Sequence, residues 1–218
     1  MRRIMILNPK GGSGKSTIAT NLASYYAQQG ECVAIADFDA QHCSLDWLAT
    51  RPATRPHIAG FAVEDDDKLL IPHGPGYLII DAPAGVHGKA MARLVKKAHT
   101  LLIPVLPSPI DMRTTARFIE ELLLVGKVER ERTRIAALAN RVRENTRSYH
   151  ALQRFLDSLG IPFLTQLRDT QNYIRAAESG LGLFDMAPAL VAHDLQQWQP
   201  LLDWLASPQS LPRDKESH

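Results

Sequence analysis

A glycine-rich stretch near the start of the chain carries the residue types best suited to chemistry. It follows the apolar run 4–7 and contains three glycines, two lysines and three hydroxyl side chains within residues 8–17. Glycines can adopt positive φ and leave no side chain between the backbone and a ligand, so successive N–H groups can point at phosphate oxygens. The pattern therefore predicts a phosphate-binding loop. Its expected binding residues are Gly11, Gly12, Ser13, Gly14, Lys15, Ser16 and Thr17.

Two side chains of this loop have distinct expected roles. Lys15 adds a positive charge near the β and γ phosphates, and the Ser16 hydroxyl is placed to bind Mg²⁺. Apolar residues then recur at helical spacing up to Gly30, so a helix N-terminus should face the same anions. The simpler alternative is a glycine-rich turn that binds nothing. The strand before it and the helix after it favour a triphosphate site.

Carboxylates follow two further apolar runs. Asp81 ends the run 78–80, and Asp39 lies just past the run 32–36. In an open parallel sheet, ligands bind outside the carboxyl ends of the strands, where both residues are expected. Asp81 is thus a candidate to hold Mg²⁺, through water. Asp37, beside Asp39, either helps to arrange this site or caps a turn or helix.

The order of these motifs resembles a known family. Residues 10–17, Lys-Gly-Gly-Ser-Gly-Lys-Ser-Thr, resemble the deviant Walker A box of the ParA/MinD ATPases, in which the early lysine is the signature residue. Residues 36–41 resemble the second acidic motif, although Ala40 stands where proline is usual. Residues 78–85 resemble the Walker B strand, and Asn140 with Arg141 follows a later strand. The resemblance runs from residue 3 to about residue 190.

The resemblance implies an α/β P-loop NTPase fold, a mostly parallel twisted sheet with helices on both faces, and ATP with Mg²⁺ as cofactors. In this family two subunits form a homodimer with ATP between them, and the signature lysine, here Lys10, reaches the other subunit's phosphates. Lys10, Lys15 and Asp39 would be the catalytic residues, with Asp39 activating water, and Asn140 would contact adenine. The alternatives are a solvated lysine at 10 and a turn residue at 140.

Length and composition fit one domain. The chain has 218 residues, 45% of them hydrophobic and 22% charged, which suffices for a full sheet covered on both faces. We expect a single domain over 1–206 and a polar tail over 207–218. No stretch of 18 consecutive apolar residues is present, so we expect a cytoplasmic protein. Cys32 and Cys43 lack metal-site spacing and are expected to be ordinary buried thiols.

Strands and helices should alternate along the chain, as in a parallel sheet. The expected later strands are 57–63, 101–105, 134–139 and 162–164, and the expected later helices are 44–50, 88–98, 112–125, 148–159 and 190–205. The last helix has acidic rather than basic polar positions, so we expect it to pack on the sheet instead of lying on a membrane.

Basic residues gather in the second half of the chain. Residues 113–175 carry 12 Lys and Arg against 7 Asp and Glu, a net charge of +5, whereas the whole chain has +2. Such a zone can bind DNA phosphates without reading sequence. Pairing with Glu129, Glu131 and Glu144 is the alternative. The candidate DNA-binding residues are Arg141, Arg143, Arg147, Arg154, Arg168 and Arg175.

The leading functional hypothesis is a ParA-like positioning ATPase, nucleoid-associated through non-specific DNA. A ParB-like or cargo-adaptor protein would stimulate slow ATP hydrolysis, and the cargo would be a plasmid, a chromosome or a protein body. The alternatives are an ATP-dependent P-loop synthetase and a MinD-like, membrane-associated positioning ATPase. For the synthetase, no residue pattern identifies a substrate pocket.

Overall fold

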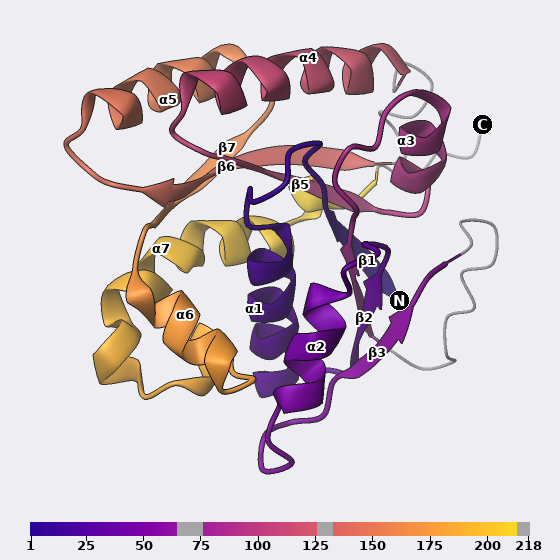
Figure 1. The fold of residues 1–218 in the computed structure, drawn as a ribbon, viewed down its shortest axis with the longest axis vertical. Coiled ribbons are helices and arrows are strands. Elements are labelled where there is room, and N and C mark those ends of the chain that lie inside the picture. Colours follow the sequence, from indigo (N-terminus) through magenta and orange to yellow (C-terminus); the bar gives the residue numbers. More distant parts are fainter. Residues whose placement is uncertain (65–75, 126–132, 213–218) are drawn as a thin grey trace.

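The computed structural model describes residues 1–64, 76–125 and 133–212, and these form a seven-stranded sheet covered by helices (Figure 1). The strand order is β3-β2-β4-β1-β5-β6-β7, and every neighbouring pair is parallel. The α/β fold expected from the alternation is therefore confirmed. The strands are β1 (Arg2–Ile6), β2 (Val33–Asp37), β3 (Ala59–Ala62), β4 (Tyr77–Asp81), β5 (Thr100–Val105), β6 (Arg134–Val142) and β7 (Phe163–Arg168).

Helices cover both faces of the sheet and enclose two apolar cores. Along β1 and the residue that follows it, alternate side chains enter opposite cores. Ile4 and Ile6 lie in the first core, and Met5 and Leu7 lie in the second. Central parallel strands are buried on both faces, which explains the continuous apolar runs in the sequence. The first core is covered by α1 (Lys15–Gln28), α2 (Cys43–Thr50), α6 (Gln171–Glu178) and α7 (Pro188–Ala206), and the second by α3 (Gly88–Val95), α4 (Pro109–Val125) and α5 (Arg147–Ser158).

Two strands extend further than their sequence patterns indicated. β6 continues to Val142, so Asn140 and Arg141 lie within the strand and not after it. β7 continues to Arg168, where only 162–164 were expected. The two strands pair with register shifts, and Arg141 has a φ of 52°. Such irregular pairing allows polar residues into a strand, which is why the apolar pattern ended before the strand did.

The C-terminal helix α7 packs on the sheet, as expected. Val191, Trp198 and Leu201 are fully buried in the first core, although Pro200 lies inside the helix. Among the described residues, no helix combines the length and the apolar character needed to cross a membrane.

The segment after α7 is not entirely a polar tail. Ser210 is fully buried in the short 3-10 helix η3 (Pro208–Ser210), and its carbonyl accepts a hydrogen bond from Thr100 at 2.7 Å. Residues up to 210 thus pack against the amino-terminal ends of the strands. Residues 213–218 of the expected tail lie outside the described residues. The expectation of buried thiols was wrong, because Cys32 and Cys43 are both exposed.

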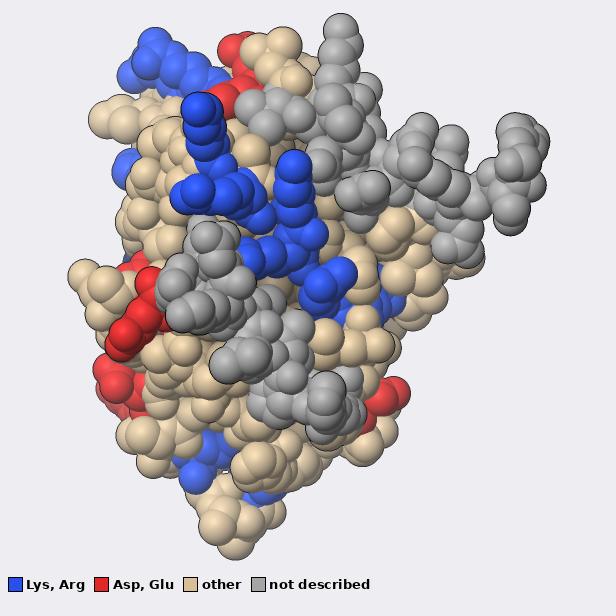
Figure 2. Space-filling view, turned by 90° about the vertical axis from the view of Figure 1, so that its right-hand side faces the viewer, with Lys and Arg blue, Asp and Glu red and all other residues tan. Residues whose placement is uncertain are grey.

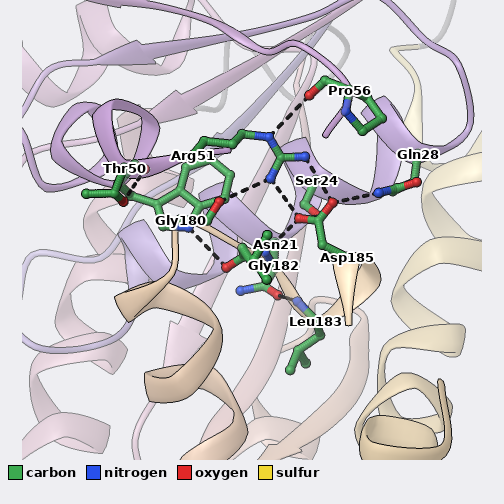
Figure 3. A network of polar contacts seen from close by, with 12 residues as sticks. Asn21, Ser24, Gln28, Thr50, Arg51, Pro56, Gly180, Gly182, Leu183 and Asp185 are labelled. Carbon is green, nitrogen blue, oxygen red and sulfur yellow. Dashed lines mark hydrogen bonds and ion pairs between the residues drawn. The ribbon is translucent and has the colours of Figure 1, made fainter. Parts of the chain in front are cut away.

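A buried polar network joins the C-terminal half to α1 and α2 (Figure 3). Arg51 contacts both carboxylate oxygens of Asp185, at 2.7 and 3.0 Å, and their side chains are 5% and 0% exposed. Ser24 and Gln28 of α1 donate to the same carboxylate at 2.7 and 2.6 Å. Burial alone would raise the pKa of Asp185, but these donors and the Gly182 N–H lower it overall. The network holds α1, which carries the phosphate loop, against the rest of the fold.

Removing the Arg51 charge should therefore destabilise the protein. We expect Arg51→Met to lower the free energy of unfolding by about 3–5 kcal/mol, because Asp185 would remain charged and buried without a cation. Since its pKa is lowered in the folded state, this contribution is present above the ordinary pKa of aspartate and disappears as the pH falls through the folded-state value. Denaturant unfolding at pH 7 and in acid measures both effects. Arg55 is exposed, so Arg55→Met is the matched control. If both variants lost the same small amount of unfolding free energy, the result would contradict this account of the ion pair.

Candidate nucleotide site

The glycine-rich loop connects β1 to α1 at the carboxyl edge of the sheet. Gly14, with a φ of 92°, is the residue before α1, and a side chain there would come within 2.1 Å of the Asn140 amide. Asn140 Nδ2 donates to the Ser13 carbonyl at 2.8 Å, so the two segments interlock. Glycine is required at 14 both for its φ and for this close approach.

The first half of the loop is held from the neighbouring strand. Asn8 is buried, and its amide donates to the Pro104 carbonyl at 2.7 Å and lies 3.3 Å from the Thr115 hydroxyl. The Pro9 carbonyl accepts from the Gly85 N–H at 2.7 Å. These bonds fix the loop from both neighbours of β1. By contrast, Gly11 and Gly12 are exposed, and neither would meet another atom within 4 Å if it carried a Cβ.

Lys15 and Asp81 bring opposite charges into a buried setting. Burial lowers the pKa of Lys15, while Asp81, Asp39 and the Cys43 thiolate act in the opposite direction. Burial raises the pKa of Asp81 to about 7, and Ser16 and Lys15 offset this only in part. The parallel pairing Ile6↔Asp81 places this carboxylate beside the strand that leads into the loop. The sequence-based prediction that these residues meet at one edge agrees with this geometry.

The residues present fit a divalent cation. Both carboxylate oxygens of Asp81 are buried and lack a well-formed hydrogen bond, and the buried Ser13 hydroxyl has no partner either. Buried polar atoms without partners are costly, so an oxygen-preferring cation such as Mg²⁺ would relieve the Asp81 site. Ser16 lies close enough to affect the pKa of Asp81 and would supply a hydroxyl. Among described residues, no group of three or more His, Cys, Asp or Glu could form a metal cage alone.

The two acidic residues after β2 behave differently. Asp37 is fully buried and accepts from the Ser44 hydroxyl at 2.5 Å, the Ser44 N–H at 3.2 Å and the Asp39 N–H at 2.9 Å. Its carboxylate thus ties the turn to the first residues of α2, which is the capping alternative. Asp39 is only partly buried and accepts from the Gln41 N–H at 3.1 Å. Asp39 thus has fewer hydrogen-bond donors than Asp37 and lies close enough to Lys15 to affect its pKa.

The loop's two lysines occupy different environments. Lys15 is buried near the carboxylates of the site. Lys10 is 38% exposed, and its Nζ lies 2.8 Å from Asp111 in the first turn of α4. The Lys10 side chain is therefore paired outside the group formed by Lys15, Asp39 and Asp81.

The candidate DNA-binding arginines divide into two groups. Arg168 contacts the fully buried Asp194 at 2.5 and 3.1 Å, so it serves the fold. Arg143 and Arg141 both face Asp169, at 2.9 and 3.5 Å. Of the acids expected to pair with them, Glu129 and Glu131 lie outside the described residues. Three arginines are exposed and make no ion pair with a described residue: Arg147, Arg154 and Arg175.

A second basic area brings together residues that lie far apart in the sequence. Figure 2 shows Lys and Arg gathered on the side that carries α3 and the start of β1. At the amino edge of the sheet, Arg2 donates to Ser210, Arg3 lies 3.0 Å from the His99 ring, and Arg134 donates to the Leu211 carbonyl at 2.9 Å. Arg2 and Arg134 are 132 positions apart, so no local charge count could place these residues in one area.

A parallel sheet with a glycine loop, a buried lysine and a carboxylate at its carboxyl edge defines a P-loop nucleotide-binding protein. The chain belongs to the CobQ/CobB/MinD/ParA nucleotide-binding domain family, whose model matches residues 4–184. Within it, the chain is a ParA/MinD-like P-loop ATPase.

Three proteins of this family that are similar to the chain are described here by their identity and coverage. A protein named maintenance of carboxysome distribution protein A from Gloeobacter kilaueensis is 32% identical over 191 residues, 84% of this chain and 83% of that protein. Its namesake from Halothiobacillus neapolitanus is 27% identical over 190 residues, 84% and 87% of the two chains. The structure of a Cyanothece McdA variant in complex with ATP superposes with a TM-score of 0.73 at 17% identity, covering 92% of this chain and 96% of that one.

The raised pKa of Asp81 leads to a pH test. In the unfolded chain this carboxyl loses its proton near 3.8, whereas in the fold it does so near 7. Stability of the nucleotide-free protein should therefore fall as the pH rises through this interval. We expect Asp81→Asn to be more stable than the wild type at pH 8, by about 2–4 kcal/mol, and nearly equal to it at pH 4. Thermal unfolding at both pH values measures the difference, and the exposed Asp157→Asn serves as control. A pH-independent difference would contradict the burial argument.

Proposed function

We propose that this protein is a ParA-like positioning ATPase. ATP and Mg²⁺ bind between the loop 11–17 and Asp81, with Ser16 and Asp81 holding the cation and Asn140 near the adenine. Two ATP-bound chains form a sandwich dimer, which binds non-specific DNA on the nucleoid in the cytoplasm. A ParB-like or cargo-adaptor partner stimulates slow hydrolysis and thereby releases the dimer.

The observation that carries this proposal is that the two lysines of the loop lie in different environments. Lys15 lies within the group that would hold the phosphates and the cation. Lys10 is partly exposed and paired with Asp111 of α4 instead of with the carboxylates of that group. In the proposed dimer it would leave Asp111 for the phosphates of the second chain. A cation supplied from another subunit would stabilise the charge that develops on the transferred phosphoryl group. Asp39 would orient the attacking water.

The relatives bear on the cargo. Two of them are named for the distribution of carboxysomes, which are protein bodies. Among the plasmid, chromosome and protein-body cargoes, these names favour a protein body for this chain too. The C-terminal helix argues against a membrane as the matrix, because most of the apolar residues of α7, among them Val191, Trp198 and Leu201, are buried in the core.

Binding to random-sequence duplex DNA tests the function. We expect retention with ATP but not with ADP, because a dimer doubles the number of phosphate contacts. The affinity should fall steeply with salt, with a log–log slope of about −0.9 for each phosphate neutralised. Filter binding across a salt series measures both properties. Binding that is absent in every nucleotide state would reject DNA as the matrix.

The exposed arginines of α5 and α6 are the proposed DNA contacts. Arg147 and Arg154 are seven residues apart, so they share a face of α5, and Arg175 lies in the last turn of α6. We expect Arg147→Ala/Arg154→Ala to weaken DNA binding and to reduce the salt slope by about 4, because the variant dimer lacks two arginines in each of its chains. Arg55→Ala, which removes an exposed arginine near the C-terminus of α2, should leave both unchanged. An unaltered slope in the double variant would exclude these two arginines.

A further inference from the structure

The ion pair between Lys10 and Asp111 is the starting point. Lys10 Nζ lies 2.8 Å from Asp111 Oδ2, and the two side chains are 38% and 7% exposed. Asp111 is thus a nearly buried carboxylate whose cation comes from the phosphate loop. A charge-assisted hydrogen bond of this length, with one partner desolvated, is stronger than an exposed surface pair.

Both partners are held by their own surroundings. The Lys10 N–H donates to Asn8 Oδ1 at 2.8 Å, and Asn8 is bonded to the Pro104 carbonyl at the end of β5. On the other side, the Asp111 N–H lies 3.4 Å from the Ser108 hydroxyl at the start of α4. The loop and the helix are therefore positioned independently of the ion pair, which can open without unfolding either element.

Asp111 is not occupied as a helix cap. Ser108 and Asp111 have the spacing of a capping box, in which the acidic side chain would accept from the serine N–H. That N–H donates instead to the Leu106 carbonyl at 2.8 Å. The carboxylate of Asp111 is left for Lys10, so its contact with the loop is not explained by the needs of the helix.

We propose that Asp111 is a latch that holds Lys10 within its own subunit and thereby sets the threshold for ATP-driven dimerisation. This inference rests on the proposed function, in which Lys10 acts across the dimer. Asp111 and a second chain's phosphates compete for the single charge of this ammonium group, because the carboxylate and the phosphates repel each other. Forming the dimer must therefore open the ion pair, and contacts to the second chain must offset the desolvated carboxylate left behind.

The test is Asp111→Asn, which keeps the shape of the side chain and removes its charge. We expect ATP-dependent dimerisation at a protein concentration lower by about a hundredfold, because each dimer opens two modest ion pairs, one in each chain, and each is worth about tenfold in the equilibrium constant. Sedimentation velocity with a non-hydrolysable ATP analogue, over a range of protein concentrations, measures the midpoint. The basal ATPase rate at sub-saturating protein should rise in parallel. Asp111→Ala replaces the asparagine variant if the latter does not fold.

Two controls isolate the latch. Glu120→Gln removes an exposed carboxylate from the same helix and should leave the midpoint unchanged. Lys10→Ala should retain ATP binding but lose hydrolysis. Adding Asp111→Asn to it should leave the dimerisation midpoint unchanged, because the latch acts only through Lys10.

The possible results distinguish the latch hypothesis from the proposed function. A lower midpoint for Asp111→Asn, or dimers in that variant alone, would support the latch. An equal or higher midpoint, with a wild type that dimerises with ATP, would overturn the latch and leave the proposed function standing. Wild type and variant that both stay monomeric with ATP would overturn both.

Discussion

The burial of opposite charges at the carboxyl edge of the sheet is the constraint on which the rest of the structure depends. Lys15 is desolvated at the start of α1, and Asp81 is desolvated at the end of β4. Each makes the other's charged state more favourable, but the carboxylate oxygens of Asp81 still lack a well-formed hydrogen bond. The parallel arrangement of β1 and β4 forces this meeting, because their last residues pair directly.

The surrounding elements keep this edge rigid. Asn140 is interlocked with the loop at Ser13 and Gly14, and Asn8 ties the loop to β5. The ion pair of Arg51 and Asp185 also holds α1 in place, because Ser24 of α1 donates a hydrogen bond to the Asp185 carboxylate. Groups that bind phosphate gain from being held in place before the ligand arrives, since less ordering is then required on binding. In contrast, Lys10 is attached through a single ion pair, which suits a residue that changes partners.

Much of the fold and site was predictable, because the relevant signals are local. The apolar runs, the glycine loop and Asp81 each follow from neighbours in sequence, and the structure brings them together as expected. The ends of β6 and β7 were not predictable, since irregular pairing places polar residues in strands. The partners of Arg168 and Arg51 were also hidden, because Asp194 and Asp185 lie 26 and 134 residues away. Charge counts locate basic segments, but only the fold shows which arginines are already paired.

The most direct test of the account is a crystal structure with a non-hydrolysable ATP analogue and Mg²⁺. The account predicts two chains facing each other across their nucleotides, with Lys10 of each chain released from Asp111 and bound to a phosphate held by the other. A single chain that binds the analogue while Lys10 stays on Asp111, or turns to its own nucleotide, would contradict it.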